Sequence, residues 1–101
     1  MKVYIAGPYS QGDPIQNTRN AILAAEKVKA RGHTPYIPHL NLLWHMVSPH
    51  DPDFWYDYDL EWLPDCDALL RLPGKSQGAD REVEEAKRWG RMVYYSIEDL
   101  P

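Results

Sequence analysis

The chain alternates short apolar segments with longer stretches of helical periodicity, and this alternation constrains its fold more than any other feature of the sequence. Glycine, proline or polar turns bound the apolar segments, and we predict strands at residues 2–6, 34–38, 67–72 and 92–95. Apolar residues at helical spacing predict helices at residues 17–31, 40–47, 57–63 and 79–89. Strands that alternate with helices are typical of a parallel sheet covered by helices.

This pattern predicts one α/β domain over residues 1–101. Right-handed crossovers favour an open, doubly wound parallel sheet of four or five strands in three layers, flavodoxin-like or Rossmann-like. Pro35 and Pro38 place the second strand at an edge, because proline cannot donate a ladder hydrogen bond. Ligands of such sheets bind beyond the carboxyl ends of the strands, so we expect a site formed by residues 7–13, 38–58 and 73–79.

The composition argues against several classes of function. The formal charge is −4, from 11 basic and 15 acidic residues, and the scattered basic residues argue against a nucleic-acid polymer as partner. No stretch approaches the roughly 18–20 consecutive apolar residues of a membrane helix. The single cysteine, Cys66, excludes an intrachain disulfide and a cysteine-based zinc cluster, and it suits a cytoplasmic location.

Three polar segments carry candidate chemistry. Residues 7–12 follow the first strand and are either a phosphate cradle or an ordinary turn into a helix. Residues 76–82 enter a helix, where Ser76 and the amides near Gly78 would hold an anion, unless the acidic residues only decorate a solvated helix start. Residues 57–63 present carboxylates on alternate positions of an amphipathic helix, and the spacing does not decide which one faces inward.

Histidines and aromatic residues cluster in the middle of the chain. The four histidines lack the spacing of metal ligands, so we predict ordinary surface or loop histidines at positions 33, 39, 45 and 50. Four aromatic side chains either fill the core, which we favour, or line a pocket: Trp44, Phe54, Trp55 and Tyr56.

The order of these segments resembles one superfamily over nearly the whole chain, from Lys2 to about Val93. The matching segments run from Val3 to Ser10 (Val-Tyr-Ile-Ala-Gly-Pro-Tyr-Ser), from Asp59 to Leu63 (Asp-Leu-Glu-Trp-Leu), over Cys66-Asp67-Ala68, and from Ser76 to Glu82. The superfamily is that of the nucleoside 2-deoxyribosyltransferases, which includes the 2'-deoxynucleoside 5'-monophosphate N-glycosidases. The Asp-Leu-Glu-Trp-Leu segment and the Ser-x-Gly-x-x-x-Glu spacing are its most specific parts.

The resemblance implies a role for three residues of this chain. Glu82 matches the glutamate that attacks the anomeric carbon, Asp59 matches the proton donor to the departing base, and Tyr4 matches the tyrosine that orients the nucleophile. Cleavage of an N-glycosidic bond creates an oxocarbenium-like centre, which a carboxylate stabilises or captures. The leaving base needs a proton from a second carboxyl group that is held neutral. We expect the substrate to be bound by Gly7, Tyr9, Ser10, Gly12, Ser76 and Gly78.

The position six residues before Glu82 favours a phosphorylated substrate. Transferases that act on unphosphorylated nucleosides resemble one another in carrying an acid there, whereas this chain has Ser76, which donates to a phosphate instead of repelling it. Where the monophosphate glycosidases have Ser-Ile-Arg-Gly, this chain has residues 8–11 (Pro-Tyr-Ser-Gln), so a phosphate-binding cation would come from Lys75 or Arg81.

These observations give a leading hypothesis and three alternatives. The leading one is cleavage of 2'-deoxynucleoside 5'-monophosphates through a deoxyribosyl–Glu82 intermediate by hydrolysis or base transfer, with Tyr9 and residues 44–56 stacking on the base. A nucleoside 2-deoxyribosyltransferase acting on unphosphorylated substrates is the first alternative. A non-catalytic nucleotide-binding module is the second, because the chain ends soon after the fourth predicted strand; a ligand-free dimerising scaffold is less favoured. We expect a homodimer, and no metal or organic cofactor.

Overall fold

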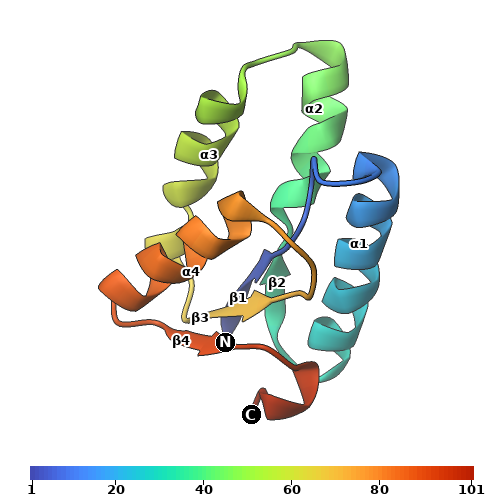
Figure 1. Ribbon diagram of the computed structural model, residues 1–101. Coiled ribbons are helices and arrows are strands. Elements are labelled where there is room, and N and C mark those ends of the chain that lie inside the picture. Colours follow the sequence, from blue (N-terminus) through green and yellow to red (C-terminus); the bar gives the residue numbers. More distant parts are fainter.

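The computed structural model describes residues 1–101 and contains one four-stranded parallel sheet with the strand order β2-β1-β3-β4 (Figure 1). Its strands are β1 (Lys2–Ala6), β2 (Thr34–Tyr36), β3 (Ala68–Arg71) and β4 (Met92–Tyr94). This arrangement confirms the predicted α/β fold with four strands, and β2 lies at an edge as its prolines predict.

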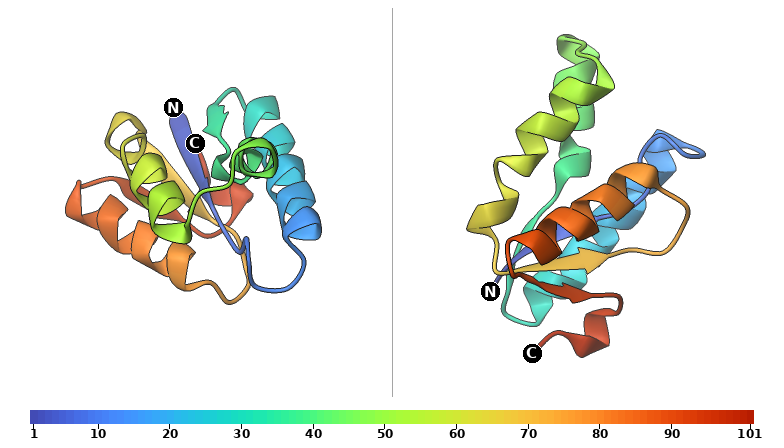
Figure 2. Two further views of the ribbon diagram at one scale, coloured as in Figure 1. Left: turned by 90° about the horizontal axis from the view of Figure 1, so that it is seen from above. Right: turned by 60° about the vertical axis from the view of Figure 1, so that its left-hand side comes forward.

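Helices cover both faces of the sheet in three layers (Figure 2). The four α-helices are α1 (Pro14–Ala30), α2 (Asn41–Val47), α3 (Pro52–Leu60) and α4 (Gln77–Arg88). α1 packs on one face and α4 on the other, while α2 and α3 extend beyond the sheet as two neighbouring arms (Figure 1). None of these helices combines the length and the apolar character that a membrane span requires.

The hydrophobic core has two parts, one on each face of the sheet, and they meet at β1. The side chains of β1 point alternately to opposite faces. Val3 and Ile5 pack in the core beneath α1, whereas Tyr4 and Ala6 pack in the core beneath α4. All four side chains are almost fully buried. A strand whose last four residues are apolar and buried therefore forms the centre of the protein.

Three helices begin earlier than periodicity predicts, because capping residues set their first turns. Asp13 accepts a hydrogen bond from the backbone N–H of Ile15, so α1 begins at Pro14 and not at residue 17. Asp51 caps Phe54 in the same way, so α3 begins at Pro52 and not at residue 57. Ser76 caps α4, so this helix begins at Gln77 and not at residue 79. The second predicted strand also ends at Tyr36, because a 3-10 turn begins at Pro38.

The loops that follow β1 and β3 touch at Gly74. This residue has a φ of +113°, and a Cβ there would lie 2.8 Å from Cγ of Pro8. Gly90, at the end of α4, has a φ of +72° but open space around it. Only glycine at position 74 lets the two loops approach this closely.

We expect Gly74→Ala to lower the free energy of unfolding by roughly 2–5 kcal/mol, since it adds a steric clash to the backbone penalty. Gly90→Ala serves as the control and should lose only the backbone part, roughly 1–2 kcal/mol. Urea unfolding of both variants measures the difference. Equal losses in the two variants would show that the contact with Pro8 is not needed.

Candidate active site

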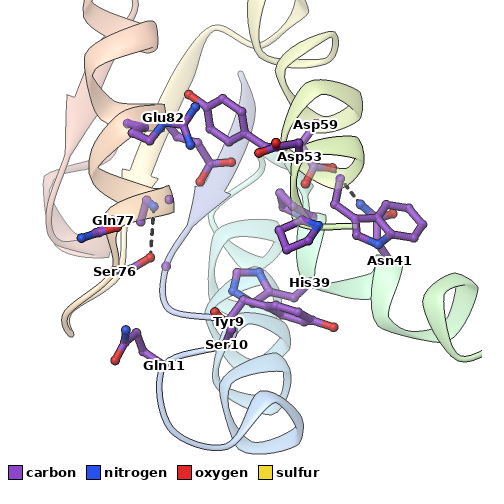
Figure 3. A pocket seen from close by; sticks show the side chains of 18 of the residues that line it. Tyr9, Ser10, Gln11, His39, Asn41, Asp53, Asp59, Ser76, Gln77 and Glu82 are labelled. Atoms are coloured by element: carbon purple, nitrogen blue, oxygen red, sulfur yellow. Dashed lines mark hydrogen bonds between the residues drawn. The ribbon is translucent and has the colours of Figure 1, made fainter. Parts of the chain in front are cut away.

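A cavity of about 500 Å³ opens at the carboxyl ends of the strands (Figure 3). Its walls come from the three loop regions that follow β1, β2 and β3, together with the first turns of α4 and one face of α2 and α3. The predicted meeting of residues 7–13, 38–58 and 73–79 is therefore confirmed, because parallel strands bring their carboxyl ends to one edge.

Glu82 enters the cavity from the second turn of α4, between the buried small residues Ala79 and Ala86. The hydroxyl group of Tyr4 donates a hydrogen bond to its Oε2. Burial raises the pKa of Glu82 to about 7, although the hydrogen bond from Tyr4 opposes this by favouring the ionised form. Glu82 is thus a desolvated carboxyl group whose orientation is fixed by a fully buried tyrosine.

Asp59 enters the cavity from the last turn of α3, on the other side (Figure 3). It is 8% exposed, whereas Glu61 is exposed to solvent, so the structure decides which of the two carboxylates faces inward. Oδ1 of Asp59 accepts hydrogen bonds from Nδ2 of Asn41 at 2.8 Å and from the hydroxyl group of Tyr36 at 3.1 Å. Burial raises the pKa of Asp59 to about 6, against these two hydrogen bonds.

The two carboxyl groups interact, because the charge of Asp59 also raises the pKa of Glu82. A pair of this kind holds a single proton near neutral pH, and the apparent pKa values belong to the pair. One ionised and one protonated carboxyl group in the same cavity can act together as a nucleophile and a general acid. That is the chemistry required to break a glycosidic bond.

Polar groups that suit an anion lie at the start of α4. Ser76 is its N-cap and accepts a hydrogen bond from the backbone N–H of Ala79 at 3.0 Å, which leaves its hydroxyl proton free to donate. Gly7, Ser10 and Gly78 also line the cavity. The helix N-terminus adds partial positive charge at the same place.

The cavity has one permanently cationic side chain. Arg81 lines it, and its guanidinium group lies 3.8 Å from the centre of the Tyr56 ring. Lys75 does not line the cavity, so Arg81 is the cation that the structure provides. No group of three or more side chains is placed to hold a metal ion.

Two predictions about binding residues need correction. Gly12, expected to bind substrate, does not line the cavity; its φ of +83° serves the turn before α1. Trp44 does not line it either, but packs edge to face against Phe54, Trp55 and Tyr58. Trp55 and the adjacent Tyr56 do line the cavity, as does Tyr9.

The histidines lie closer to the candidate site than their spacing in the sequence predicts. Three of the four line the cavity, namely His39, His45 and His50. His39 is 4% exposed and hydrogen bonds through Nε2 to the backbone oxygen of Pro8 at 3.0 Å. Burial lowers the pKa of His39 and so keeps the ring neutral. Their position in the chain could have indicated this, because all three lie in residues 38–58, which we expected at this edge of the sheet.

Comparisons with known proteins agree with this architecture. The profile of a family described as "Domain of unknown function (DUF7768)" matches residues 1–96. No curated protein sequence matches the chain. Among solved structures, a 2-deoxyribosyltransferase from Bacillus psychrosaccharolyticus has 20% identity and a TM-score of 0.69, over 92% of this chain and 69% of that one. A second one, from Leishmania mexicana, has 20% identity and a TM-score of 0.66, over 91% of this chain and 61% of that one. The chain therefore has the fold of the 2-deoxyribosyltransferases.

The raised pKa of Glu82 predicts that the stability of the protein depends on pH. The folded state binds the carboxyl proton of Glu82 more tightly than the unfolded state does. This proton therefore stabilises the fold fully below pH 4.5, and the stabilisation is lost as the pH rises through about 7. Glu82→Gln removes the titration and keeps an acceptor for Tyr4. We expect its free energy of unfolding, relative to the natural protein, to rise by up to about 3 kcal/mol between pH 4.5 and pH 8.

Urea unfolding at the two pH values measures this change. Glu84→Gln is the matched control, because its side chain is 71% exposed on the same helix, and it should show no such pH dependence. A Glu82→Gln difference that is the same at both pH values would show that Glu82 is ordinarily solvated.

Proposed function

We propose that this chain, which belongs to the DUF7768 family, breaks the N-glycosidic bond of 2'-deoxynucleoside 5'-monophosphates through a covalent deoxyribosyl–Glu82 intermediate. One observation carries the proposal: a buried and a half-buried carboxyl group, each held by a tyrosine hydroxyl, face the same cavity. The fold shared with 2-deoxyribosyltransferases supports it.

The first step uses both carboxyl groups. The ionised carboxylate of Glu82 attacks C1' of the sugar, and the C1'–N bond breaks with its electron pair going to the base. In the form of the pair that reacts, the shared proton is on Asp59, which delivers it to that base, so the base leaves neutral. Tyr4 holds the attacking carboxylate in position through its hydroxyl group.

The second step releases the sugar. A water molecule attacks C1' from the side that the base has left, Asp59 takes its proton, and the bond to Glu82 breaks. A second base can replace the water, and the reaction is then a transfer. Two displacements at the same carbon retain the configuration of the sugar.

In this proposal the 5'-phosphate binds at the start of α4. Ser76 donates its free hydroxyl proton there, while the loop with Gly7 and Ser10 lies opposite. Hydrogen bonds to a charged group are worth roughly 1.5–3 kcal/mol each. Arg81 offsets part of the negative charge that Glu82 and Asp59 contribute to the cavity.

We expect free base to appear when the protein is incubated with 2'-deoxynucleoside 5'-monophosphates, as measured by chromatography. Glu82→Ala should lower the rate at least about a thousandfold, because no other group captures the sugar. Glu84→Ala, on the exposed side of the same helix, should leave the rate unchanged. Adding an acceptor base distinguishes the two outcomes of the second step.

Three results would contradict this proposal. Nucleotide binding without any release of base would favour a non-catalytic binding module. Unchanged turnover in Glu82→Ala would remove the assigned nucleophile. Base exchange between unphosphorylated nucleosides alone would make the protein a transferase without a phosphate site.

Ser76 tests the phosphate site separately. Aspartate and asparagine both cap helices well, so either substitution keeps α4 intact, and only aspartate introduces a negative charge. We expect Ser76→Asp to lower kcat/KM for monophosphates relative to nucleosides by about tenfold or more. Ser76→Asn should change this ratio much less. Equal effects of the two substitutions would show that the phosphate does not lie beside Ser76.

A further inference from the structure

Polar contacts join α2 and α3 at two successive levels beside the cavity. At the first level Asn41 donates to Asp59, and at the second Nε1 of Trp55 donates to Nδ1 of His45 at 2.9 Å. Asn41 and His45 are four residues apart on α2, and Trp55 and Asp59 are four residues apart on α3. The two levels therefore lie on the same helix faces, one turn or about 5.4 Å apart.

These contacts fix the tautomer of His45. An indole N–H is only a donor, so Nδ1 of His45 must be the acceptor. The backbone N–H of His50 points to the same nitrogen at 3.2 Å. With the lone pair of Nδ1 used by two donors, the ring proton resides on Nε2.

Nε2 of His45 is an unused donor at the cavity wall. No group of the chain accepts from it, since Nδ1 makes all of the side-chain hydrogen bonds of His45. Only two side-chain atoms are both buried and without a hydrogen-bond partner, namely His39 Nδ1 and Arg91 Nε. Nε2 of His45 has no partner and is not one of them, so it is accessible from outside the protein. Because His45 lines the cavity, this N–H is available to a ligand.

Geometry decides which part of the ligand it meets. If Asp59 protonates the leaving base, as in the proposed function on which this inference rests, the base lies against the first level. His45 then lies one turn farther from the reacting carbon, beside the far edge of the base. Trp55, which also lines the cavity, borders the same space.

We propose that His45, oriented by Trp55, donates a hydrogen bond from Nε2 to an oxo group on the far edge of the base and so selects oxo bases over amino bases. An oxo group accepts this hydrogen bond. An amino group at the same place presents its own N–H, so two donors face each other and neither is satisfied. A site built to pair with one group rejects the other for this reason.

Paired substrates that exchange an oxo for an amino group test the selection. 2'-Deoxyinosine and 2'-deoxyadenosine 5'-monophosphates form one such pair, and those of deoxyuridine and deoxycytidine form another; within each pair the adjoining ring nitrogen also changes, from N–H donor in the oxo base to acceptor in the amino base. We expect kcat/KM to favour the oxo member by about tenfold or more. His45→Gln, whose amide can turn either its N–H₂ or its oxygen to the base, should bring the ratio close to one.

A second variant separates orientation from contact. Trp55→Phe keeps an aromatic ring but removes the indole N–H, so it should lower the oxo-to-amino ratio of kcat/KM. Trp44→Phe is the matched control, since Trp44 belongs to the same aromatic cluster, makes no hydrogen bond through its indole and does not line the cavity. A ratio that is unchanged in His45→Gln, or a natural preference for amino bases, would overturn the proposal.

Nitrogen NMR of the imidazole groups tests the inference without catalysis. The free protein should show His45 with its proton on Nε2, and free hypoxanthine, but not adenine, should shift that signal in both the natural protein and Glu82→Ala. If no substrate releases base and this shift still appears, the proposed function fails and the role of His45 stands. If base is released and neither ligand, or both equally, shifts the signal, the role of His45 fails alone.

Discussion

Two tyrosines that are paired in the sheet determine how the candidate site is built. Tyr4 of β1 lies opposite Tyr36 of β2 in the strand register, and their ring centres are 5.5 Å apart. Tyr4 donates to Glu82 of α4, while Tyr36 donates to Asp59 of α3. The parallel pairing of two strands thus sets the separation and orientation of two carboxyl groups that come from distant helices. Because Tyr4 is fully buried in the core beneath α4, the packing of the core and the position of Glu82 are coupled.

This arrangement costs stability, because it holds two carboxyl groups away from water. Both carboxyl groups have a raised pKa because burial disfavours their charged forms, and the hydrogen bonds only partly compensate. A protein selected for stability alone would fill this region with apolar side chains. Desolvated acids that titrate near neutral pH are typical of catalytic sites, which is why the pair, and no other titratable cluster, supports an enzymatic function.

The helices α2 and α3, which form one wall of the cavity, contain few buried residues. α2 has no buried residue, and several of its apolar side chains are exposed, including Leu43, Met46 and Val47. Its contacts with α3 include the polar ones of Asn41 and His45 and the aromatic ones of Trp44 and His45. Elements with so few buried contacts open more readily than the sheet does. The part of the site assigned to the base is therefore carried by the least buried part of the fold.

The sequence by itself determined the alternation of strands and helices, the edge position of β2 and the loops that meet at the cavity. Its resemblance to a known superfamily singled out Tyr4, Asp59, Ser76 and Glu82 as candidate site residues. Periodicity, glycine and proline are local signals, and parallel strands must bring their carboxyl ends together. The Asp-Pro pairs that start α1 and α3 were also readable, although periodicity alone missed them. Only the tertiary structure decided that Asp59 and not Glu61 faces inward, that Tyr36 and Asn41 hold it, and that Trp55 fixes the tautomer of His45. Those contacts join elements whose relative rotation depends on packing across the whole sheet, and no local pattern in the chain encodes that rotation.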